Sequence, residues 1–197
     1  MTPGLIALLL LGQFAAVDPD AAAAPQSQSQ DSCLPDDTGF LSMRLRGSIE
    51  AELDWRGSIL HCTGMSRPDG RGLRLRFSGP LPGAGELAVV FAAPELGMGV
   101  SARSVPVNIT LLDRRGQRVY GTRGDRNCAF DEVLQQPLPD PALPPRSFRV
   151  TARGFCTVPA RALDGDGAVL LTRFDFAGMV TFQEPDRAAP IVDKILK

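Results

Sequence analysis

The sequence predicts an all-β fold: an antiparallel β-sandwich of the jelly-roll or immunoglobulin-like kind, with a small β-barrel as the alternative. About eight short apolar or alternating segments are separated by turn residues, and 20 glycines and 17 prolines interrupt the 197 residues. No long segment repeats its apolar residues with the period of a helix. The expected strands are residues 45–55, 59–65, 73–77, 87–92, 105–112, 117–122, 147–155 and 168–176.

The clearest strand signal is the alternation of apolar and polar residues up to Trp55. One parity carries Ile49, Ala51, Leu53 and Trp55, and the other carries Ser48, Glu50, Glu52 and Asp54. Because successive side chains of a strand point to opposite faces, this segment should bury one face and expose the other. The same rule places Leu75 and Phe77 inward and Arg74 and Arg76 outward. The predicted core contains Ile49, Leu53, Trp55, Leu75, Phe77, Val89, Ile109, Leu111, Phe148, Val150, Phe174 and Phe176.

The turns are predicted from their residue types. Asp113-Arg-Arg-Gly116 fits a type I turn with a glycine bulge, which predicts a hairpin. Residues 137–145 contain five prolines, so they should cross the surface in an extended form, most simply between two sheets. Asp164-Gly-Asp-Gly167 is a further turn.

The residues at the two ends of the sequence differ in composition from the expected domain between them. Residues 4–17 are apolar except for Gln13, which is too short for a bilayer span but suits a secretory signal, and alanines 21–24 offer a cleavage site. No Lys or Arg precedes this run, which departs from the usual signal. We therefore expect a signal peptide over residues 1–23, a polar linker over 24–32, a β-sandwich domain over 33–183 and a tail over 184–197. The tail either forms a short helix at 191–196 or stays loose.

The four cysteines support export. Cys33, Cys62, Cys128 and Cys156 form an even, widely spaced set without a C-x-x-C pair, which indicates two structural disulfides rather than a metal or redox motif. Because consecutive elements are usually neighbours, we predict the pairs Cys33–Cys62 and Cys128–Cys156. The main alternative joins Cys62 to Cys156 across two sheets, as in immunoglobulin domains.

Charge excludes one class of partner. The formal net charge is −1, so the basic surface needed to bind nucleic acid is not expected. No transmembrane span, metal site or cofactor site is expected either. Asp164 and Asp166 resemble the start of an EF-hand loop, but Ala168 and Val169 then depart from the pattern.

Catalytic motifs are sparse. Glu50 and Glu52 resemble a glycosidase carboxylate pair, since alternate strand residues lie roughly 7 Å apart, but they are expected on a wet face near Arg74 and Arg76. A cross-strand charge ladder explains them better. His61 is the only histidine and lies beside Cys62, which should be oxidised. The chain also has no Gly-x-Ser-x-Gly motif, so serine hydrolysis is not expected.

Two functions remain open on this basis. The favoured one is a non-catalytic binding or structural module in the periplasm or outside the cell, whose partner is an envelope protein or a glycan. Its ligand is expected at loops 94–104 and 122–131, with Met98, Arg103, Arg123 and Asp125 as candidate contacts. The tripeptide 123–125 matches an integrin-recognition motif, although turn composition accounts for it. The alternative is a periplasmic hydrolase that uses Glu50 and Glu52.

Overall fold

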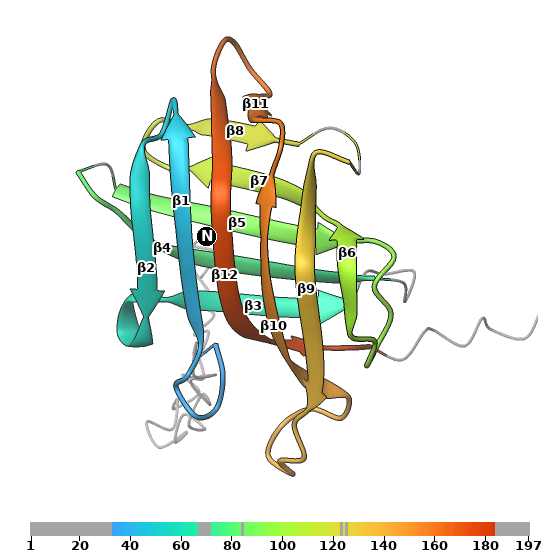
Figure 1. Ribbon diagram of the computed structural model, residues 1–197. Helices are drawn as coiled ribbons and strands as arrows, with labels where there is room; N and C mark the ends of the chain where they lie inside the picture. Colours follow the sequence, from blue (N-terminus) through green and yellow to red (C-terminus); the bar gives the residue numbers. More distant parts are fainter. Residues whose placement is uncertain (1–32, 67–71, 84, 123, 125, 184–197) are drawn as a thin grey trace, which may run out of the picture. The chain divides into compact units, whose positions relative to one another are not determined.

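The described part of the chain confirms the predicted all-β class. A computed structural model describes residues 33–66, 72–83, 85–122, 124 and 126–183. The predicted signal peptide, the predicted linker, the tail, and Arg123 and Asp125 lie outside these residues. Figure 1 shows the arrangement of the strands.

Twelve strands and one short 3-10 turn are present within the described residues. The elements are β1 (Phe40–Gly47), β2 (Ala51–Arg56), η1 (Gly57–Ile59), β3 (His61–Ser66), β4 (Leu73–Leu81), β5 (Gly85–Ala93), β6 (Ala102–Pro106), β7 (Asn108–Asp113), β8 (Arg118–Gly121), β9 (Cys128–Pro137), β10 (Ser147–Cys156), β11 (Ala160–Ala162) and β12 (Ala168–Thr181).

The strands form two layers that cross at a steep angle (Figure 1). The front layer has the order β2-β1-β12-β10-β9-β6, and the back layer has the order β8-β7-β5-β4-β3. All of these neighbours pair in the antiparallel sense. Hydrogen bonding also joins the layers, because β11 pairs with both β8 and β12, and the end of β12 pairs with β3 in the parallel sense. The fold therefore has the facing layers of a sandwich and the layer-to-layer pairing of a barrel.

The core fills the space between the two layers. Every predicted core residue is buried except Phe148, which is partly buried and packs against the others. At the centre, the ring of Phe91 from the back layer lies 4.8 Å from that of Phe176 and 5.1 Å from that of Phe174, both on β12. Contacts between aromatic rings at such distances stabilise a fold beyond simple area burial. The two layers thus share one hydrophobic core.

Glycines permit the close contacts between β12 and its neighbours. A Cβ at Gly64 on β3 would lie 2.0 Å from the carbonyl oxygen of Met179, and one at Gly178 would lie 3.1 Å from Leu75 and Phe77 side-chain atoms. No larger residue fits at Gly64 without moving the backbone. The glycines at positions 64 and 178 thus explain how β12 passes so near to β3 and β4.

The prediction of one strand over residues 45–55 is wrong. The chain turns at residues 48–50, so this segment contains the end of β1 and most of β2, which form a hairpin. Gly47 has a φ of +109°, and a Cβ there would lie 2.4 Å from the carbonyl oxygen of Ala168. The amide of Ser48 donates to that same carbonyl at 2.9 Å. The predicted parity still holds along β2, where Leu53 and Trp55 are buried and Glu52 and Asp54 are exposed.

Three further details differ from the prediction. The 105–112 segment is divided, because β6 in the front layer ends at Pro106 and β7 in the back layer begins at Asn108. The proline-rich segment joins β9 to β10, which are neighbours in one layer, and so does not cross between sheets. The hairpin after Asp113 is confirmed, but Gln117 rather than Gly116 has the positive φ, at 49°. A Cβ at residue 116 would lie 2.4 Å from the Asp113 carboxylate, which accepts hydrogen bonds from the Arg115 and Gly116 amides, so a larger residue there would displace this carboxylate.

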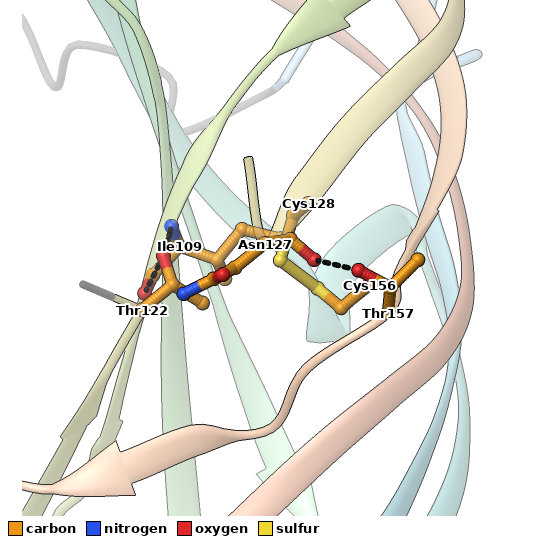
Figure 2. Close-up of a disulfide and its surroundings, with 6 residues drawn as sticks. All are labelled: Ile109, Thr122, Asn127, Cys128, Cys156 and Thr157. Atoms are coloured by element: carbon orange, nitrogen blue, oxygen red, sulfur yellow. Dashed lines mark hydrogen bonds between the residues drawn. A yellow bond between two sulfur atoms is a disulfide. The ribbon is translucent and has the colours of Figure 1, made fainter. Parts of the chain in front are cut away.

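Both disulfides have the predicted pairing. Cys33–Cys62 connects the first described residues to β3, and Cys128–Cys156 joins directly opposed residues of β9 and β10. Figure 2 shows the second bridge next to Thr157, whose hydroxyl donates to the carbonyl of Asn127 at 3.3 Å. The alternative pair Cys62–Cys156 is thereby excluded. Since β9 and β10 already pair along their length, this bridge reinforces a hairpin.

Candidate functional site

The first predicted ligand loop, residues 94–104, is held in place by hydrogen bonds from the Gln135 side chain. Gln135 of β9 is 6% exposed, and its side-chain oxygen accepts from the amide of Gly99 at 3.1 Å. Its side-chain nitrogen donates to the carbonyls of Gly97 and Val100, both at 2.8 Å. Met98 of this loop has 46% of its surface exposed. The loop is therefore exposed but fixed in position.

The other predicted loop residues are distributed differently. Arg103 lies on β6 rather than in a loop, and its side chain, which is 78% exposed, pairs with Glu132 at 3.2 Å. Residues 128–131 of the second loop belong to β9. Arg123 and Asp125 lie outside the described residues, so their role remains a prediction. Neither Met98 nor Arg103 lines either of the two depressions described below.

Glu50 and Glu52 form exposed ion pairs. Glu50 pairs with Arg46, and Glu52 pairs with Arg44, with 68% and 65% of the two glutamate side chains exposed. The charge ladder that we expected is present, but its partners were wrongly assigned, because Arg74 and Arg76 lie on β4 in the other layer. Exposed pairs of this kind each contribute at most about 1 kcal/mol.

A line of polar side chains crosses the outer face of the front layer. Directly opposed residues on successive strands are Arg103, Glu132, Arg153, Asp175, Ser42 and Asp54, and we call this line the ionic row. Glu132 pairs with Arg153 at 3.0 Å as well as with Arg103. Partial burial raises the pKa of Asp175 above its ordinary value, while Arg153, Arg173 and Arg56 act in the opposite direction.

Two carboxylates of the ionic row share a shallow depression. This depression of about 200 Å³ is lined by Glu132, Leu134, Thr151, Ala152, Arg153 and Asp175. Glu132 and Asp175 lie on either side of Arg153, so their backbones are two strand spacings apart, or roughly 10 Å. We call it the Asp175 depression.

A larger depression lies on the outer face of the back layer. It has a volume of about 350 Å³ and is lined by His61, Cys62, Thr63, Arg76, Ser78, Glu86 and Arg114. We call it the His61 depression. Its volume is at the lower end of the range for small-molecule sites.

Strand pairing explains which residues meet in the His61 depression. Arg76 of β4 lies opposite Thr63 of β3, and Ser78 of β4 lies opposite His61. On the other side of β4, Ser78 lies opposite Ala88 of β5. Ser78 and Ala88 are short and buried, at 7% and 1% exposure, although they are on the outer face. Short side chains between longer ones make the surface hollow here.

Arg114 closes one end of the His61 depression from the turn after β7. Its backbone amide donates to the carbonyl of Glu86 at 3.1 Å, and its guanidinium pairs with the Glu86 carboxylate at 3.3 Å. The hairpin turn thus holds this guanidinium at the edge of β5. The described part of the chain contains no group of three or more His, Cys, Asp and Glu side chains arranged to hold a metal ion.

The residues of the His61 depression come from four separate parts of the sequence. The sequence pattern did predict that Arg76 faces outward, but not that Ser78, Glu86 and Arg114 surround it. Comparison with protein-family models, curated proteins and solved structures found no match to this chain.

Proposed function

We propose that the protein is an exported, disulfide-bonded, non-catalytic binding module of the bacterial envelope or extracellular space. Its partner is an envelope protein or a glycan, and the His61 depression is the part of its surface that receives the ligand. The observation that carries this proposal is the hollow itself, which is lined by two guanidinium groups, one of them paired with the Glu86 carboxylate, and by two hydroxyls and an imidazole, mostly from residues of paired strands. Sites built on strands are held more precisely than sites on free loops.

Export is supported by the chemistry of the cysteines. Both disulfides close between described residues, and such bonds persist in oxidising compartments such as the periplasm. The apolar run over residues 4–17 and the alanines that follow it favour a cleaved secretory signal. Within the residues that the structure describes, no helix has the length and apolar character to span a bilayer.

Arrays of envelope glycans and envelope peptides test the binding role. The protein would be purified from the producing cells with its disulfides intact, alongside Arg76→Ala and the control Arg74→Ala. Arg74 is on the same strand and the same face as Arg76 but does not line the depression. We expect a ligand that binds the natural protein and Arg74→Ala but is lost from Arg76→Ala. Equal binding by all three proteins would place the ligand elsewhere, and no binding to either array would contradict the proposal.

Carboxylate-dependent hydrolysis is the second candidate function. It is favoured by one observation, the Asp175 depression, which is lined by the Asp175 carboxyl, whose pKa is raised, and by the Glu132 carboxylate, which is paired with Arg153 and Arg103. Two carboxyl groups in one hollow could serve as an acid and a base. However, the ionic row accounts for both residues as surface partners of arginine. We therefore rank this function second.

Glycoside hydrolysis by these two carboxylates can be tested directly. Asp175→Asn and Glu132→Gln should each abolish turnover of a panel of chromogenic glycosides, while Glu50→Gln and Glu52→Gln should not. Turnover that survives both of the first two changes would remove this candidate.

A further inference from the structure

One side chain of the His61 depression is buried without an internal partner. Ser78 is 7% exposed, and its hydroxyl forms no hydrogen bond with any described residue. No buried side-chain oxygen in the described residues lacks both a partner and contact with solvent, so this hydroxyl opens onto the depression that it lines. Buried polar groups are usually satisfied, and one that is open only to a hollow suits a ligand.

The positive and negative side chains that line the His61 depression do not balance. The Glu86 carboxylate is paired with Arg114 at 3.3 Å. Arg76 is half-buried, and no acidic group among the described residues lies within ion-pair distance of it. The two guanidinium groups and one carboxylate therefore leave a positive charge over the floor that Ser78 forms.

We infer that the His61 depression binds an oxyanion, a carboxylate, phosphate or sulfate group, between Arg76 and Arg114. The Ser78 and Thr63 hydroxyls and an imidazole N–H of His61 supply further donors around it. This inference deepens the proposed function, on which it rests, because it names the chemical group that the module recognises.

The donor types favour an oxyanion over other ligands. Guanidinium groups are fixed, planar donors that stay charged, and they match the oxygens of carboxylate and phosphate groups. An apolar ligand would leave the hydroxyls and Arg76 unpaired. A cation would meet a site with a net positive charge, since its only carboxylate already has a partner.

The inference can be tested with simple ions. The natural protein would be titrated with inorganic phosphate, inorganic sulfate and glucuronate at constant ionic strength, with chloride as the reference, and followed by amide NMR shifts. We expect saturable shifts centred on residues 61–63, 76–78 and 114 for at least one anion. The responses to phosphate and sulfate, compared with that to glucuronate, separate an inorganic-type oxyanion from a sugar carboxylate.

Variants sharpen the test. Arg76→Ala should weaken the binding about tenfold or more, because one charged hydrogen-bond donor is lost, whereas Arg74→Ala should stay within about twofold. Glu86→Gln should strengthen it, since the competing negative charge is removed while the amide of Arg114 still donates to the residue 86 carbonyl. A merely structural role for these residues gives no such gain. Melting curves of each variant would verify folding.

Two outcomes would overturn the inference: no saturable response to any of the three anions, or equal weakening by Arg74→Ala and Arg76→Ala. Either result leaves the proposed binding role standing if the arrays still yield a ligand. If the protein bound an anion but no glycan or peptide on the arrays, the oxyanion site would be supported and the proposed glycan or peptide partner would be contradicted.

Discussion

Gln135 shows how a single polar side chain can organise a surface loop. It occupies an inward position of β9, where the nearest other inward residues, Val133 and Phe130, are apolar. Its side-chain amide uses both donors and its acceptor on the backbone of residues 97–100. Satisfied in this way, the amide costs little to bury and replaces the hydrogen bonds that a strand would have given the loop.

Replacement of Gln135 by leucine should therefore destabilise the protein by about 1 to 3 kcal/mol, because backbone groups of the loop lose their partners. Urea unfolding measures this loss, and hydrogen exchange should accelerate at the amide of Gly99. The neighbouring Gln136 is exposed, so Gln136→Leu is the matched control, with an expected change of roughly 0.5 kcal/mol or less. Similar effects of the two changes would contradict the role given to Gln135.

Asp175 predicts a dependence of stability on pH. Partial burial raises its pKa in the folded protein, so the folded state keeps the proton to a higher pH than the unfolded chain does. Its contribution is present below the ordinary value of 3.8 and is lost as the pH rises through the raised folded value. Asp175→Asn should match the natural protein in acid and become relatively more stable as the pH approaches neutrality. Thermal melts over this range check the sign, and a relative loss of stability toward neutral pH would show it to be wrong.

At the scale of elements, the Cys128–Cys156 bridge is the strongest local restraint on the β9–β10 hairpin. The two cysteines are 28 positions apart in sequence and directly opposed in the register. Closing such a loop in the unfolded chain is worth about 3 to 4 kcal/mol on chain-entropy grounds. The proline-rich connection between the strands makes no ladder of its own, so the bridge and the ladder together hold the hairpin.

The double change Cys128→Ala and Cys156→Ala should lower the free energy of unfolding by about 2 to 4 kcal/mol while the fold is retained. Denaturant titration measures the loss, and far-UV circular dichroism checks the strand content. Substitution of Cys33 and Cys62 is the matched comparison, because that loop is 29 positions long. An unchanged midpoint after loss of Cys128–Cys156 would show that the β9–β10 ladder suffices alone.

Some elements could be predicted from sequence and others could not, for physical reasons. The alternation over residues 73–77 correctly placed both arginines outside and the apolar residues inside, because β4 is regular there. The strand β9 was missed, since its register shifts opposite Arg153 and Gly154, which interrupts the alternation near Asp131, and since Gln135 is polar but inward. The β1–β2 turn was missed because the alternation of polarity continues through it without a break.

The candidate site was less predictable than the fold. Single strands reveal which residues face outward, but the His61 depression depends on the register between β3, β4 and β5 and on the turn that carries Arg114. Register is a property of pairs of strands and is not contained in either one alone. The loops favoured from sequence were chosen for their turn residues, which report backbone geometry rather than ligand chemistry.

At the scale of the described domain, both layers are joined through one aromatic cluster. Phe91 contacts four other phenylalanine rings, those of Phe77, Phe130, Phe174 and Phe176. Phe77 and Phe91 come from the back layer, and the other three come from the front layer. Because the layers also exchange hydrogen bonds through β11 and the end of β12, neither should unfold while the other remains.

Phe91→Ala should accordingly lower the free energy of unfolding by about 3 to 5 kcal/mol, since it removes a fully buried ring and leaves a cavity between the layers. Phe155→Ala is the control, because Phe155 is 41% exposed on the outer face of β10 and its loss should cost far less. Tryptophan fluorescence from Trp55 and far-UV circular dichroism would follow the same urea titration. Their transitions should coincide in both variants, because the remaining core still couples the layers. Two separated transitions in Phe155→Ala, where the core is intact, would mean that the layers are independent folding units and that their shared core does not couple them.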